Sequence, residues 1–74
     1  MLENFLGGLH PVALAAGRDL IRRLDLSGRR RLLDAGCGTA GVAIALCESL
    51  PDLTATAADL APVAKLAERF VAEA

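Results

Sequence analysis

The run from Leu32 to Gly41, Leu-Leu-Asp-Ala-Gly-Cys-Gly-Thr-Ala-Gly, constrains the fold of this 74-residue chain more than any other feature. Its glycines, Gly36, Gly38 and Gly41, have the spacing G-x-G-x-x-G and follow a short apolar segment with strand character. In this pattern the first glycine permits a tight turn, the second lets a ligand approach the backbone, and the third lets the next helix pack close to the strand. The alternative is an ordinary turn between a strand and a helix, with no ligand.

A helix is expected before the glycine run. It should begin near Pro11, because proline suits the first position of a helix, and end at Ser27-Gly28. Three- and four-residue spacing predicts one apolar stripe. Its members are Val12, Ala13, Ala16, Leu20 and Leu24.

Strand, helix, strand and helix are expected after it. The strands should cover residues 31–35 and 53–58, and the helix between them, residues 40–50, has no polar face and should be buried. A last helix should start near Pro62. Its apolar stripe is Val63, Leu66, Ala67, Phe70 and Val71.

This order predicts an α/β fold. Two strands joined through a helix form a right-handed parallel pair, and strands that are apolar throughout need helices on both faces of the sheet. We therefore expect a partial Rossmann-like, doubly wound parallel sheet with the order helix-strand-helix-strand-helix. Residues 1–74 should form one incomplete domain, with an N-terminal helical segment at 1–28 and a ligand-binding βαβα unit at 29–74.

Two acidic residues end the strands, where α/β sheets bind ligands. Asp59 follows the second strand and suits the two hydroxyls of a ribose, with capping of the last helix as its alternative role. Asp34 stands two positions before Gly36. It would repel a pyrophosphate and attract a cationic group, and its alternative role is to bond the amides of the turn.

The segment Asp34-Ala-Gly-Cys-Gly-Thr resembles motif I of class I S-adenosylmethionine-dependent methyltransferases, whose usual form is acidic-x-Gly-x-Gly-x-Gly. Asp59 matches the acidic position that binds the ribose in these enzymes. The resemblance covers residues 32–74. It implies that S-adenosyl-L-methionine is the cofactor, whose ammonium and sulfonium groups would complement the charge of Asp34.

Residues 10–33 and 59–67 are similar to small-molecule O-methyltransferases of the plant and hydroxyindole type. Two departures are Ala40, which replaces the third glycine of the motif, and Ala61, which interrupts an Asp-Leu-Pro sequence. The resemblance places the methionine end of the cofactor at Asp34 and the turn 36–38, and the ribose at Asp59. The cofactor-binding residues that it implies are Asp34, Ala35, Gly36, Cys37, Gly38, Asp59 and Leu60.

Composition and charge bear on the binding partners and the location of the protein. The net charge of −1 gives no electrostatic case for nucleic acid, although six arginines lie between Arg18 and Arg31. They are read as a solvated face, with a phosphate- or partner-binding patch as the alternative. No apolar run is long enough for a membrane, and the two cysteines suit neither a disulfide framework nor a metal site, so we expect a cytoplasmic protein without metal.

We therefore expect a methyltransferase that acts on a small-molecule acceptor, present here as a cofactor-binding fragment that is inactive alone. No catalytic residue is assigned, and the acceptor site should lie outside this chain. Cys37 is read as a small residue that fits the turn, and His10 as the mark of a helix start rather than a base. The alternatives are an NAD(P)-binding module of an oxidoreductase and a non-enzymatic interaction fragment. The hydrophobic fraction of 54% would also allow a homo-oligomer.

Overall fold

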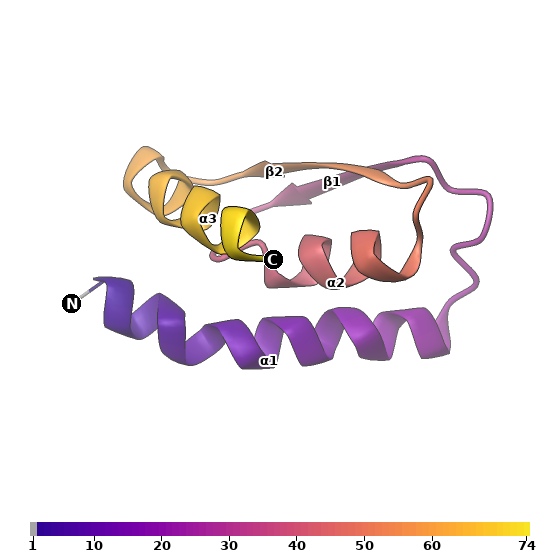
Figure 1. The fold of residues 1–74 in the computed structure, drawn as a ribbon, viewed down its shortest axis with the longest axis horizontal. Coiled ribbons are helices and arrows are strands. Elements are labelled where there is room, and N and C mark those ends of the chain that lie inside the picture. The colour runs from indigo at the N-terminus through magenta and orange to yellow at the C-terminus, as the bar shows by residue number, and fades with distance from the viewer. Residues whose placement is uncertain (1) are drawn as a thin grey trace.

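The computed structural model describes residues 2–74 and has the predicted order of elements (Figure 1). The elements are α1 (Leu2–Arg23), β1 (Arg31–Ala35), α2 (Gly41–Ser49), β2 (Thr54–Ala58) and α3 (Ala61–Glu73). The two strands pair in parallel, with Arg31 opposite Thr54 and Ala35 opposite Ala58. The fold is thus a partial Rossmann-like α/β arrangement.

The helices are layered on one face of the sheet. Figure 1 shows α2 between the sheet and α1, with α1 running along the length of the molecule. Leu32 of β1 packs against the core on this side, whereas the neighbouring Leu33 is 68% exposed on the other. Helices on both faces were expected, and within residues 2–74 only one face is covered.

The core forms around α2, as its lack of a polar face predicts. Ala43, Ile44, Ala45 and Leu46 are all buried. Side chains from α1, β1, β2 and α3 pack against this helix, among them Leu14, Leu32, Ala55 and Phe70. Burial of α2 by all of the other elements fixes the position of its first turn, which directly follows the glycine run.

The prediction for the ends of α1 was wrong. The helix begins at Leu2 and includes Pro11, although an interior proline removes one backbone hydrogen bond and costs about 3 kcal/mol. Tertiary contacts of the first three turns offset this cost, since Leu6 is buried against the rest of the molecule. The helix also ends early, at Arg23, and Asp25 then accepts a hydrogen bond from the backbone of Ser27 at 3.0 Å.

The predicted apolar stripe of α1 is largely exposed, and of its members only Ala13 packs against α2. Val12 is 65% exposed and Leu24 is 54% exposed. The helix contacts α2 through small residues instead, and a Cβ atom added at Gly17 would lie 2.7 Å from the Cβ of Ala45. Close approach of two helix backbones therefore decides which face of α1 is buried, rather than the size of its apolar side chains.

The third helix largely agrees with the prediction. Pro62 lies in its first turn, Ala67 is buried, and the predicted polar residues Lys65, Glu68, Arg69 and Glu73 are exposed, while Val71 of the predicted stripe is 51% exposed. An ion pair of 2.6 Å between Arg69 and Glu3 joins α3 to the start of α1.

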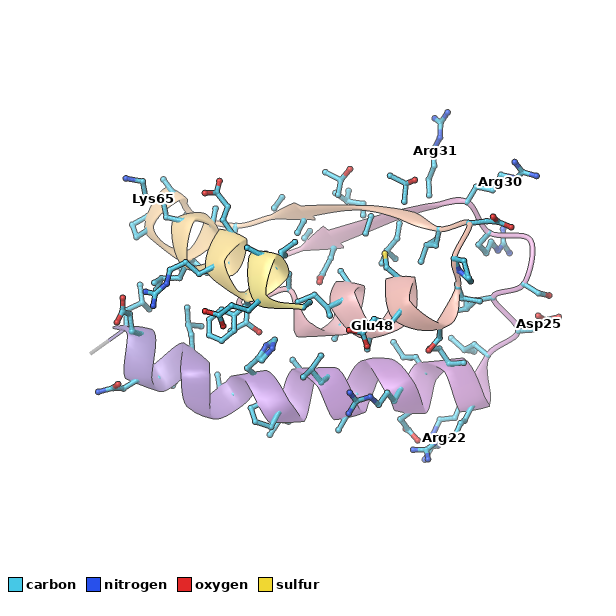
Figure 2. All side chains as sticks on the ribbon, viewed as in Figure 1. Arg22, Asp25, Arg30, Arg31, Glu48 and Lys65 are labelled. Atoms are coloured by element: carbon cyan, nitrogen blue, oxygen red, sulfur yellow. The ribbon has the colours of Figure 1, made fainter. Side chains whose placement is uncertain are left out.

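The arginines between residues 18 and 31 are all exposed. Arg22 and Arg23 both form ion pairs with Asp19 one turn earlier in α1. Arg31 points out of the uncovered face of the sheet, and Arg30 points away from the end of the molecule (Figure 2). This arrangement fits a solvated surface. Between residues 2 and 74, no helix is both long and apolar enough to cross a membrane.

Candidate functional site

The turn after β1 is held by its own backbone amides. The N–H groups of Gly36 and Cys37 both donate to the carbonyl oxygen of Ala58, at 2.7 and 3.1 Å, and the N–H of Gly38 donates to Oδ2 of Asp59 at 2.9 Å. Gly36 and Gly38 have φ angles of +70° and +57°, which a side chain would strain. We call residues 36–40 the glycine loop. Its amides connect the end of β1 to the end of β2, which parallel pairing already places side by side.

Asp59 connects this loop to the start of α3. Its Oδ1 accepts a hydrogen bond of 2.7 Å from the N–H of Leu60, while Oδ2 accepts from Gly38. The N-cap residue of α3 is Leu60, and no side chain caps this helix. The alternative role of Asp59 as a helix cap is therefore wrong. A carboxylate has about four acceptor positions, so Asp59 retains capacity for further donors.

Asp34 has an acceptor atom that nothing in the described chain satisfies. Its Oδ2 is buried without a hydrogen-bond partner among residues 2–74. The alternative reading, a bond to the amides of the turn, is wrong because those amides donate to the end of β2 instead. Burial raises the pKa of Asp34, and the nearby negative charge of Asp59 raises it further. A buried acceptor of this kind requires a donor or a cation.

Cys37 lies near both of these carboxylates. Burial raises the pKa of its thiol, and the charges of Asp34 and Asp59 add to the effect. The sulfur also lies 3.6 Å from the carbonyl oxygen of Gly38. A protonated thiol is a poor nucleophile, so the environment of Cys37 fits a small residue in the turn.

The third glycine has a different role from the one predicted. A Cβ added at Gly41 would lie 2.6 Å from the Cβ of Ala13, so this glycine lets α2 approach α1 rather than β1. The preceding Ala40 is 1% exposed and has a φ of +65°, the left-handed conformation that favours glycine. It is the N-cap of α2 and makes no side-chain capping bond. The start of α2 therefore carries a strained alanine.

A contact between α1 and the glycine loop was not predicted from the sequence. The interpretation of His10 as a helix start is wrong, because this residue lies within α1. Nδ1 of its ring lies 2.5 Å from Oγ1 of Thr39. Thr39 is 3% exposed and belongs to the glycine loop. The two residues lie 29 positions apart, so no local pattern in the sequence marks the pair.

Five of the seven residues assigned to the site come together: Asp34, Gly36, Cys37, Gly38 and Asp59. Ala35 alternates with Asp34 along β1, so its side chain is on the opposite, exposed face of the sheet. Leu60 is 76% exposed beside Asp59. Among residues 2–74, no three His, Cys, Asp or Glu side chains are grouped to hold a metal ion.

The glycine loop and the two acidic side chains lie at the carboxyl ends of parallel strands, which is where sheets of the Rossmann-like class bind their ligands. Comparison with known proteins gives the family. The protein-family model of the O-methyltransferase domain matches residues 2–74 of the sequence. The chain therefore belongs to this family.

Two curated relatives are similar to the chain. One is a 3-hydroxy-5-methyl-1-naphthoate 3-O-methyltransferase of Streptomyces sahachiroi, 39% identical over 72 residues, which are 97% of this chain and 21% of the relative. The other is an L-tyrosine C(3)-methyltransferase of Streptomyces lavendulae, 42% identical over 59 residues, 80% of this chain and 16% of the relative. The chain thus spans about a fifth of the length of these relatives.

Proposed function

We propose that this chain forms the part of a methyltransferase that binds S-adenosyl-L-methionine. When bound, this cofactor supplies a methyl group activated by a positively charged sulfur. The residues of the chain bind and orient it, because aligning the methyl group with the acceptor is the main task of such an enzyme.

The buried, unpartnered Oδ2 of Asp34 is the observation that carries the proposal. A carboxylate oxygen removed from water is costly unless a donor or cation satisfies it. The ammonium group of the cofactor's methionine end is both. A second carboxylate, Asp59, lies close enough to raise the pKa of Asp34, so the site favours a ligand that brings positive charge.

The other residues of the site have complementary roles in this proposal. The backbone of Ala35, Gly36, Cys37 and Gly38 forms the wall along the methionine end, where Gly36 and Gly38 leave no Cβ atom in the way of a ligand. Asp59 accepts hydrogen bonds from the ribose while it keeps its bond to Gly38. The exposed Leu60 offers an apolar surface beside the nucleoside.

The two alternatives from the sequence have less support. A pyrophosphate of NAD would lie against the carboxylates of Asp34 and Asp59, which repel it, and the chain belongs to a methyltransferase family rather than to an oxidoreductase family. An interaction fragment without a ligand would leave the buried oxygen of Asp34 unexplained.

The acceptor is proposed to be a small molecule that binds outside residues 1–74, because the chain spans only about a fifth of its relatives. The family description favours oxygen as the atom that receives the methyl group, although one relative is named for methylation of a carbon. A catalytic base would also lie outside this chain. A homo-oligomer, formed through the uncovered sheet, remains part of the proposal.

Calorimetric titration of the intact protein with S-adenosylhomocysteine and with NAD tests the cofactor. We expect S-adenosylhomocysteine to bind and NAD not to bind. Asp34→Asn, which keeps the shape and removes the charge, should weaken S-adenosylhomocysteine about ten-fold or more. Asp52→Asn is the matched control, because Asp52 is exposed in the turn before β2, at the opposite end of the sheet. Binding of NAD alone, or equal affinity in both variants, contradicts the proposal.

A further inference from the structure

We propose that His10 and Thr39 form a positioning pair that holds the glycine loop in the conformation that receives the cofactor. This inference rests on the proposed function, since it concerns the same site. Nδ1 of His10 lies 2.5 Å from Oγ1 of Thr39, and Thr39 directly follows Gly38, whose amide is bound to Asp59. A side chain of α1 therefore reaches the loop that lines the site.

The ring of His10 also contacts a second aromatic ring. Its centroid lies 4.4 Å from the ring centroid of Phe70 in α3, with an angle of 42° between the planes. Side chains restrained by two contacts lose little further freedom when a ligand binds. The imidazole thus joins α1, the glycine loop and α3 at one point.

Neighbouring turns of α1 support the same region. One turn before His10, the side chain of Leu6 is 3.9 Å from where a Cβ of Gly38 would lie, and Leu6 is 6% exposed. One turn earlier again, Glu3 binds Arg69 of α3 at 2.6 Å. The first half of α1 therefore packs along the glycine loop and α3, which accounts for a helix that continues through Pro11.

The pair matters because glycine loops are costly to order. Gly36 and Gly38 have left-handed φ angles and lose much conformational freedom when the loop is fixed. Within the described residues, two side chains from outside the loop bond to it, Asp59 at Gly38 and His10 at Thr39. The carbonyl of Ala58 holds the start of the loop, at Gly36 and Cys37. Of the two side chains, Asp59 is also assigned to the ribose, so His10 is the one that can hold the loop without itself contacting the ligand.

Substitutions of the pair, made in the intact protein, separate positioning from general stability. His10→Phe keeps a ring to stack on Phe70 and removes Nδ1, while Thr39→Val keeps the volume and removes the hydroxyl. We expect each to raise the Kd for S-adenosylhomocysteine about five- to ten-fold, the effect of one hydrogen bond. Thr39→Ser keeps the hydroxyl and should stay within about two-fold of the unchanged protein. The double variant should be no weaker than the singles, because both remove one interaction.

Leu53→Val is the control for stability. Leu53 is buried before β2, at the end of the sheet away from the glycine loop, and its replacement by valine removes one methylene from the core. It should lower Tm about as much as Thr39→Val and leave the Kd unchanged well below Tm. If Leu53→Val weakens binding equally, or if His10→Phe and Thr39→Val bind normally, the positioning role is overturned. If the unchanged protein binds no S-adenosylhomocysteine, the proposed function fails instead.

Discussion

The carboxylate of Asp59 lies 2.9 Å from the backbone nitrogen of Gly38 and so joins the end of β2 to the loop that follows β1. The carbonyl of the preceding Ala58 accepts from two further amides of the same loop. Two segments separated by a complete helix thereby become one surface. The site is assembled by the pairing of β1 with β2, and its acidic side chains are close together because parallel strands end at the same edge.

Replacement of Asp59 by alanine tests this connection. The change removes the acceptor for the amides of Gly38 and Leu60, so we expect the free energy of unfolding to fall by about 1–3 kcal/mol. The affinity for S-adenosylhomocysteine should fall together with it. Denaturant unfolding and calorimetry measure the two effects. Unchanged stability in Asp59→Ala would mean that the bond to Gly38 contributes nothing.

Asp34 should lower the stability of the ligand-free protein at neutral pH. Burial and the charge of Asp59 raise its pKa in the folded chain, so the folded state binds this proton more tightly than the unfolded state does. The free energy of unfolding therefore falls as pH rises through the interval between the unfolded pKa and the raised folded pKa.

Asp34→Asn removes this pH-dependent loss of stability, because asparagine does not ionise. The variant should have a higher Tm than the unchanged protein at pH 7 without ligand, and the advantage should shrink in acid as Asp34 becomes protonated. Thermal unfolding between pH 3 and pH 7 measures it, with Asp52→Asn as the exposed control. A lower Tm for Asp34→Asn at pH 7 would indicate that the charge of Asp34 already has a favourable partner.

Ala40 should tolerate glycine and reject valine. Its left-handed φ of +65° costs a residue with a side chain roughly 1–2 kcal/mol, whereas glycine would lose a buried methyl group worth about 0.8 kcal/mol. Ala40→Gly should therefore change stability by less than about 1 kcal/mol. Ala40→Val adds bulk at a position that is 1% exposed and should destabilise by more than about 2 kcal/mol. Equal stability of the two variants, measured by denaturant unfolding, would argue against this conformation.

Gly17 should be needed for the contact between α1 and α2. A Cβ at this position would lie 2.7 Å from the Cβ of Ala45 and 2.9 Å from the carbonyl oxygen of Val42. Gly17→Ala should therefore destabilise by about 1–2 kcal/mol, even though alanine favours helix. The matched control is Gly8→Ala in the same helix, where the added Cβ meets nothing within 4 Å and should stabilise by up to about 1 kcal/mol. In thermal unfolding, the Tm of Gly17→Ala should fall and the Tm of Gly8→Ala should rise relative to the unchanged protein.

Much of the site can be predicted from the sequence because its signals are local. The turn at Gly36 and Gly38, the burial of α2 and the acidic residues that end each strand depend on patterns within about ten neighbouring residues. The resemblance to methyltransferases rests on the same short motif, and the family to which the chain belongs agrees with it.

The amino-acid sequence by itself determined the order of elements, the glycine loop and the acidic ends of the strands. Only the tertiary structure decided which face of α1 is buried, that this helix continues through Pro11, that Gly41 faces Ala13, and that His10 meets Thr39. Each of these depends on contacts between residues far apart in the chain, and such contacts outweigh local preferences of about 1–3 kcal/mol per residue. The tertiary structure also decided that an oxygen of Asp34 has no hydrogen-bond partner, because the amides of the loop donate to the end of β2 instead.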